Sequence, residues 1–129
     1  MKHSKALRKH KVTPRAKLKR KLDALAKELM YKRDGHVCVI CGSTKNVGWG
    51  HVFSSRTEAT RWDLMNIHAQ CWPCNFAHVR DNWMYFQWME QEYGKEELEK
   101  LRFRFKNPKR RTRLDLEIMV DEYTKLLTD

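Results

Sequence analysis

The sequence predicts a small α+β fold in which two short strands and a helix surround a four-cysteine site, with further helices on either side. Two Cys-x-x-Cys pairs bracket the middle of the chain, and two strand-like segments lie between them. Apolar residues recur at helical spacing both before and after this middle part. A chain of 129 residues has the length of one domain, and a core this small often needs a metal or covalent staple.

The first helix is expected to begin at Thr13-Pro14 and to end near Arg33. Threonine caps helices well, and a proline in the first helical position loses no needed N–H group. Asp34-Gly35 is a turn signal that ends the helix. One apolar stripe is expected along this helix, formed by Leu18, Leu22, Leu25 and Leu29.

The remaining elements follow from spacing and turn residues. Strands are expected at 46–53 and 62–68, a helix from Cys71 to about Gly94, and another helix over 95–106. A last helix is expected to start at Thr112, with Asp115 completing the cap. Three parts result: a basic arm with its helix (1–33), a zinc-bound core (34–94) and a C-terminal helical segment (95–129).

Positive charge is concentrated at the start of the chain. Residues 1–33 hold 13 Lys and Arg against two acidic residues, which accounts for the whole net charge of +11. A basic arm on a neutral body is typical of nucleic-acid binding, although a solvated tail is the alternative. No apolar run is long enough for a membrane span or a secretory signal, so a cytoplasmic protein is expected.

The four cysteines predict a structural zinc site. Cys38/Cys41 and Cys71/Cys74 each present two thiolates, and two such pairs close a tetrahedral site with no open position. Disulfides are the alternative, and they are rare in intracellular proteins. A saturated thiolate site holds the fold and performs no catalysis.

A second group of residues lies between and just after the cysteine pairs. His51 ends the first expected strand, Asn66 lies on the second, and Asn75 follows the last cysteine. On a continuous helix, Asn75, His78 and Asn82 would share one face. A lone histidine is more often an ordinary surface or core residue, but this one falls beside two asparagines and a helix start. Trp83, Phe86 and Met89 have helical spacing and are expected in the core, whereas Trp49 and Trp72 fit either packing on the cysteines or stacking of a base.

These motifs resemble those of the HNH, or ββα-metal, nucleases, whose core is similar to a treble clef. The segment from Tyr31 to Gly42 resembles their first cysteine knuckle. Gly50-His51, Arg61-Trp62-Asp63, the run from Asn66 to Asn75 and Asp81-Asn82 resemble the phage NinG/Rap recombination nuclease family. The resemblance covers roughly residues 33–94. It implies a phage-encoded, structure-selective DNA endonuclease that acts on recombination intermediates.

The resemblance also implies residue roles. His51 would deprotonate the attacking water, and Asn66 would hold the base in register. Asn75 would ligate a catalytic Mg²⁺ or Mn²⁺. Gly50 differs from many relatives, which carry Asp or His before the base, and Asn75 replaces a common histidine. A second ligand is therefore expected at His78 or Asn82, with His68 or Asp81 next.

The leading hypothesis is a metal-dependent DNA endonuclease, and the leucine stripe offers a surface for a homodimer. The alternatives are a non-catalytic zinc-dependent nucleic-acid-binding module and a protein-interaction module. Cations expected to contact DNA are Lys9, Lys11, Arg15, Lys17, Lys19, Arg20, Arg56 and Arg61.

Overall fold

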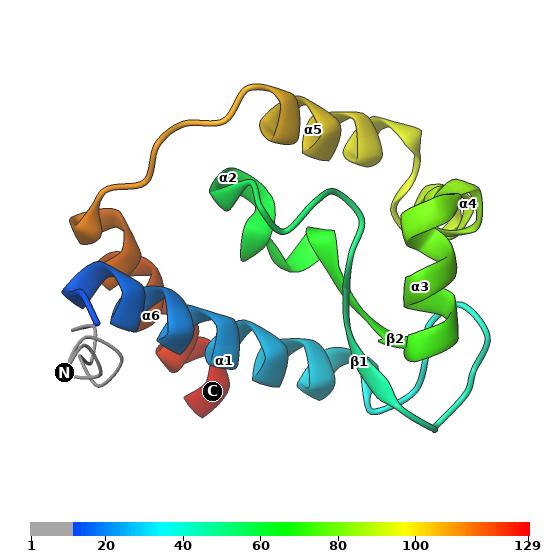
Figure 1. Ribbon diagram of the computed structural model, residues 1–129, viewed down its shortest axis with the longest axis horizontal. Coiled ribbons are helices and arrows are strands. Elements are labelled where there is room, and N and C mark those ends of the chain that lie inside the picture. Colours follow the sequence, from blue (N-terminus) through cyan, green and yellow to red (C-terminus); the bar gives the residue numbers. More distant parts are fainter. Residues whose placement is uncertain (1–11) are drawn as a thin grey trace, which may run out of the picture.

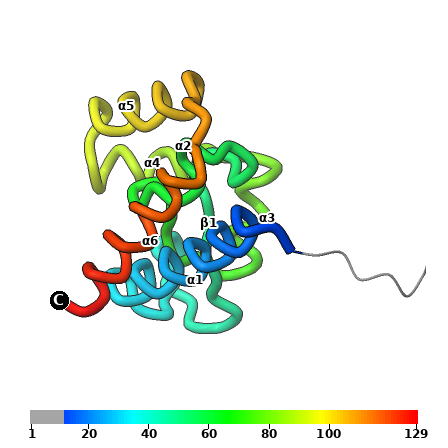
Figure 2. Tube along the Cα trace, turned by 90° about the vertical axis from the view of Figure 1, so that its left-hand side faces the viewer, coloured from blue at the N-terminus to red at the C-terminus, as the bar shows by residue number. Residues whose placement is uncertain are grey.

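The computed structural model describes residues 12–129 and has a mixed α+β architecture, which confirms the predicted class (Figure 1). In both views the short helix α2 lies between α5 and the pair formed by α1 and α6 (Figures 1 and 2). The elements are α1 (Pro14–Asp34), β1 (Val47–His51), α2 (Glu58–Arg61), the 3₁₀ turn η2 (Leu64–Asn66), β2 (Ile67–Cys71), α3 (Trp72–Arg80), α4 (Trp83–Tyr93), α5 (Lys95–Lys106) and α6 (Arg113–Thr128).

The ends of α1 are as the sequence predicts. The Thr13 hydroxyl accepts the Ala16 N–H at 3.1 Å, and Pro14 is the first helical residue. Gly35, with φ of 71°, ends the helix and donates its N–H to the Tyr31 carbonyl. The buried face is rotated from the expected leucine stripe, since Leu25 is only half-buried. The buried residues of α1 are Leu22, Ala26, Leu29 and Met30.

The two strands form one antiparallel hairpin, in which Val47 pairs with Cys71 and His51 pairs with Ile67. The second strand predicted at 62–68 is wrong in its bounds, because residues 64–66 form η2 and β2 begins only at Ile67. The Asp63 carboxylate accepts the Met65 N–H and starts the η2 turn. All five residues of β2 are buried, so this strand is covered on both faces and shows no alternation of apolar and polar residues.

The predicted helix from Cys71 to Gly94 is also wrong, because the chain breaks at Asp81-Asn82 into α3 and α4. The Asp81 carboxylate accepts the Trp83 N–H at 3.0 Å and so starts the second helix. Asn82 precedes α4 and is exposed. The expected common face of Asn75, His78 and Asn82 therefore does not exist.

Two hydrophobic clusters form the core, and β2 contributes to the first. Ile67 and Ala69 pack with α1, Trp62 and α6. The other cluster joins Val52 and Phe53 to Tyr85 and Met89 of α4 and to two leucines of α5. The helix over 95–106 is confirmed, and so is the Thr112–Asp115 capping box of α6. The expected core position of Met89 is confirmed, Phe86 is half-buried, and Trp83 is 59% exposed.

Across residues 12–129, none of the helices is both long and apolar enough to span a membrane.

Candidate functional site

The four cysteine sulfurs meet at one point, as predicted. Cys38 and Cys41 follow α1, Cys71 ends β2, and Cys74 lies in the first turn of α3. Their sulfur atoms all lie within 4.8 Å of one another, and Cys41 and Cys71 are separated by 3.6 Å. A tetrahedron of Zn–S bonds has edges of about 3.8 Å. All four cysteines are free of disulfides, so this cluster could hold a metal ion such as zinc.

The backbone around the cluster favours the charged form of one cysteine. Burial raises the pKa of the Cys38 thiol, but hydrogen bonds from the backbone of Cys41, Cys71 and Ile40 outweigh it and lower the pKa to about 7. The Val39 N–H also donates to the Ala69 carbonyl at 2.9 Å, which ties the first cysteine turn to β2. A pre-formed turn with N–H groups aimed at sulfur suits a thiolate metal site.

His51 ends β1, and its ring orientation is set by a neighbouring loop. Its Nε2 lies 2.9 Å from the carbonyl oxygen of Arg61, in the last residue of α2. A carbonyl only accepts, so Nε2 carries the proton and Nδ1 keeps a free lone pair. The ring packs edge-on against Trp49. Burial lowers the pKa of His51, so the imidazole is neutral at pH 7.

A cavity of about 570 Å³ opens beside His51. It brings together three of the residues singled out in the sequence, His51, Asn75 and His78, with Arg61 on its wall. Ser54, Ser55 and the exposed Val79 complete the lining, together with Trp49 and Val52. The base candidate and two candidate metal ligands thus face one space, whereas Asn66 and Asn82 do not line it.

Asn66 is fully buried and tethers the loop that follows β1. Its side-chain oxygen accepts the Phe53 N–H at 2.8 Å, and its amide donates to the carbonyls of Phe53 and Thr60 at 3.1 and 2.9 Å. These bonds hold the two ends of residues 53–60, the segment that directly precedes Arg61, the hydrogen-bond partner of His51. Asn66 therefore acts on the site through the backbone.

His68, which the sequence offered as a reserve ligand, has both ring nitrogens engaged and is not available to a metal. The Tyr85 hydroxyl donates to the Gly50 carbonyl at 3.0 Å, so it accepts the Nδ1–H of His68 at 2.9 Å. The Tyr93 hydroxyl then donates to Nε2 at 2.7 Å. Burial, together with the nearby charge of Arg33, lowers the pKa of His68 to about 3. This chain of hydrogen bonds holds the carbonyl just before His51.

α2 is anchored to α1 by a half-buried ion pair. The Arg61 guanidinium donates to both oxygens of Asp23 at 2.9 and 2.8 Å, and the Trp62 indole donates to the same carboxylate. Burial alone would raise the pKa of Asp23, but hydrogen bonds from Arg61 and Trp62 lower it. Because Arg61 also supplies the carbonyl for His51, this pair positions the His51 ring.

The cations expected to contact DNA fall into three groups. Arg15 and Lys19 both pair with Glu58 of α2, and Arg61 pairs with Asp23. Lys17, Arg20 and Arg56 form no ion pair within the described part of the chain. Lys9 and Lys11 lie outside the described residues.

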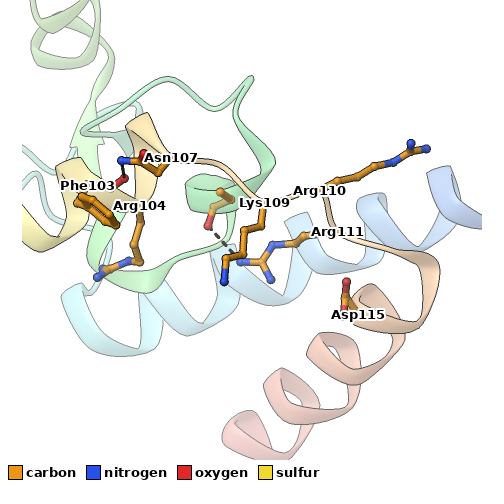
Figure 3. Close-up of a pocket in the computed structure, with 8 residues that line it drawn as sticks. Phe103, Arg104, Asn107, Lys109, Arg110, Arg111 and Asp115 are labelled. Carbon is orange, nitrogen blue, oxygen red and sulfur yellow. Dashed lines mark hydrogen bonds between the residues drawn. The ribbon is translucent and has the colours of Figure 1, made fainter.

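There are two further surfaces, of which the sequence had singled out only the second, through Trp72. A basic cavity of about 480 Å³ lies between α5, α2 and the loop before α6, and Figure 3 shows Arg110 extending away from that loop. Arg111 donates to the Ala59 carbonyl at 3.1 Å, so the cavity shares α2 with the His51 cavity. The run Lys109-Arg110-Arg111 after Pro108 was the available sequence signal. On α3, Trp72 stacks on Phe76, and the two rings are 63% and 52% exposed.

The fold and the site thus define a mixed α+β protein with a four-cysteine candidate metal centre and an adjacent histidine cavity. The family described as bacteriophage lambda NinG protein matches residues 1–129, and the chain belongs to this family. No curated protein and no solved structure matches the chain.

Proposed function

We propose that this chain is a metal-dependent endonuclease of the HNH type that hydrolyses DNA phosphodiester bonds. The proposed substrates are branched or nicked recombination intermediates in the host-cell cytoplasm. Membership of the bacteriophage lambda NinG protein family and the motif resemblance from Gly50 to Asn82 support this proposal. The observation that carries the proposal concerns His51. Its imidazole is neutral, its Nδ1 keeps a free lone pair, and the residue lines an open cavity.

In the proposed reaction His51 acts as the general base. Its Nδ1 takes a proton from a water molecule, the water oxygen bonds to phosphorus, and the bond from phosphorus to the 3′ oxygen breaks. The leaving oxygen takes up a proton from solvent, so the products are a 5′-phosphate and a 3′-hydroxyl. The Nε2–H bond to the Arg61 carbonyl persists when the ring becomes charged, and it stabilises the imidazolium.

Two kinds of metal ion belong to the proposal. Zinc in the four-cysteine cluster holds the hairpin against α3 and leaves no open position for chemistry. A catalytic Mg²⁺ or Mn²⁺ would be held by Asn75, which shares the cavity with His51, whereas the Nε2 of His78 is already bonded to the Val52 carbonyl. Such an ion would stabilise negative charge on the phosphorus oxygens and on the leaving oxygen.

DNA is the proposed partner, and it would bind along the basic surface around α2. Lys109 and Arg110 are exposed, and they form no ion pair among residues 12–129. Phosphates of one strand could therefore contact this loop while another part of the duplex reaches the His51 cavity. The exposed Trp72–Phe76 stack supports contact with an unpaired base, as branched DNA would present.

The deciding experiment is a cleavage assay on supercoiled plasmid, linear duplex and a four-way junction, each with Mg²⁺, Mn²⁺, Zn²⁺ or EDTA. The proposal predicts cleavage with Mg²⁺ or Mn²⁺, none with EDTA, and a preference for the junction over the linear duplex.

A second candidate function is a non-catalytic zinc-dependent DNA-binding module. The observation that favours it is Gly50, which brings no side chain next to His51. Binding to the junction without cleavage under every metal condition would select this module.

A further inference from the structure

A third, much smaller cavity also borders His78. Its volume is about 50 Å³, and Gln70, His78, Asp81 and Cys74 are among its lining residues. It is separate from the His51 cavity, and His78 is the residue that the two share. A space of this size admits one small ion with one or two waters, or a water alone.

Two buried acceptor atoms in this cavity have no hydrogen-bond partner among residues 12–129. One is the side-chain oxygen Oε1 of Gln70, a residue that is 2% exposed. The other is Nδ1 of His78, whose Nε2 donates to the Val52 carbonyl at 3.1 Å. Because Nε2 carries the proton, Nδ1 presents a lone pair. Burying an acceptor without a partner is unfavourable, so these two atoms favour a positively polarised occupant in the cavity.

The Gln70 side chain lies directly against the backbone of Gly50. A β-carbon on residue 50 would lie 1.8 Å from Gln70 Oε1 and 2.7 Å from Gln70 Cδ. Any side chain at position 50 would therefore drive the Gln70 amide away from its position. The glycine admits the amide, and the burial of β2 on both faces leaves Gln70 little room elsewhere.

A carboxylate completes the donor set. One oxygen of Asp81 accepts the Trp83 N–H, and the other has no bond in the described part of the chain. Asp81 is exposed and lines the cavity with Gln70 and His78. The three residues offer an amide oxygen, an imidazole nitrogen and a carboxylate oxygen. The second nitrogen of His78 is already bonded to a backbone carbonyl, which is the usual arrangement of a histidine that ligates a metal.

We propose that this cavity binds one divalent cation, of the Mn²⁺ class, through Gln70 Oε1, His78 Nδ1 and the Asp81 carboxylate. Mixed oxygen and nitrogen donors favour a transition metal over Ca²⁺. Binding of the cation does not depend on the proposed function. Only a role of this cation in cleavage rests on that function, because His78 borders both cavities.

The test measures Mn²⁺ binding and leaves activity aside. Zinc-loaded protein is titrated with Mn²⁺, and free Mn²⁺ is followed by its EPR signal. The native chain is expected to bind one Mn²⁺ at this site, distinct from the catalytic ion proposed at Asn75, in competition with Mg²⁺. Gln70→Met, which keeps the shape and loses the donor, should weaken binding on the order of 10-fold or more. Gln70→Glu should tighten it by a similar factor, because a carboxylate replaces an amide.

Two further variants test the site at residues other than Gln70. Gly50→Ala should weaken Mn²⁺ binding because its β-carbon displaces the Gln70 amide. Asp81→Asn changes an exposed residue and keeps an oxygen for the Trp83 N–H, so it should weaken binding without unfolding the chain. The matched controls are Gln87→Met on the surface of α4 and Asp121→Asn on α6, both expected to bind Mn²⁺ as the native chain does.

Unchanged Mn²⁺ affinity in Gln70→Met and Asp81→Asn would overturn the site and leave a buried water as the occupant. A parallel cleavage assay separates this inference from the proposed function. Mn²⁺ binding that responds to these variants in a chain that cuts no DNA would retain the site and remove the nuclease. If the native chain cuts DNA but the Gln70 variants bind Mn²⁺ as tightly as it does, the nuclease is retained and the cation site is removed.

Discussion

The Nε2 atom of His51 lies 2.9 Å from the carbonyl oxygen of Arg61, across a loop that begins directly after His51 itself. The Arg61 side chain in turn binds Asp23 of α1 with two hydrogen bonds. The orientation of the His51 ring therefore depends on three segments: β1, α2 and α1. A proton acceptor whose orientation is fixed by three segments is suited to general-base catalysis, because the ring is already in the reactive orientation when the substrate binds.

His51→Ala should reduce DNA cleavage by a factor on the order of 10²–10⁴, which is the usual contribution of a positioned general base. Zinc content, circular dichroism and DNA affinity should stay near those of the native chain, because the substitution removes no cysteine and no cation. His36→Ala is the matched control, since His36 is exposed outside the cavity and stacks on Tyr31. Equal cleavage by native and His51→Ala protein would remove His51 as the base.

The pH dependence of cleavage should reflect the buried position of His51. Burial lowers its pKa from the ordinary value of about 6.5, so the ring stays unprotonated to lower pH. The rate of cleavage is therefore expected to stay on its plateau below pH 6.5 and to fall only at more acidic pH. Single-turnover rates measured from pH 5 to 8 check this. An acidic limb centred above 6.5 would contradict the assignment.

The cysteine cluster should hold one zinc per chain and should support the hairpin. Thiolate-bound zinc contributes on the order of 10 kcal/mol to the folding of small zinc modules, so Cys38→Ser or Cys74→Ser should lose the metal and unfold β1, β2 and α3. Elemental analysis and thermal denaturation with and without a chelator measure both effects. Protein purified with disulfides between these cysteines and no zinc would refute the prediction.

Stability should fall between pH 7 and pH 5 because His68 is buried in its neutral form. Its folded pKa is about 3, so below about 6.5 the unfolded chain binds a proton that the folded chain does not. Each pH unit costs about 1.4 kcal/mol, or about 2 kcal/mol at pH 5. His68→Gln should flatten this part of the urea-denaturation profile. The acids with lowered pKa, Asp23, Asp34 and Glu58, destabilise only at lower pH.

The salt dependence of DNA binding should separate the basic arm from the loop before α6. Removing residues 1–11 should lower the slope of log affinity against log salt by about 0.9 for each phosphate that the arm neutralises. The double variant Lys109→Ala with Arg110→Ala should lower it by about 1.8 if both cations bind phosphates. Lys100→Ala, at a lysine already paired with Glu97, is the control for charge alone. If one of these alterations leaves the slope unchanged, the altered segment contacts no phosphates and is only solvated.

The sequence determined the features that depend on neighbouring residues. The cap at Thr13-Pro14, the stop at Gly35 and the Thr112–Asp115 capping box are local hydrogen-bond patterns, and each could be predicted from a few residues. The cysteine spacing likewise predicted a four-sulfur cluster, because each Cys-x-x-Cys turn brings its own pair together. The grouping of His51 with Asn75 followed from their places at a strand end and a helix start next to that cluster.

Tertiary structure alone decided the rest. β2 lies at Ile67–Cys71, not at 62–68, because helices cover both of its faces and erase the alternation that marks a strand. The break at Asp81-Asn82 removed Asn82 from the site, although each half of that segment is helical in pattern. The partners of His68 and the approach of Gln70 to Gly50 join residues of different elements, 17 residues apart for His68 and Tyr85. Such pairs form only when the packed core brings the elements together, so no local pattern records them.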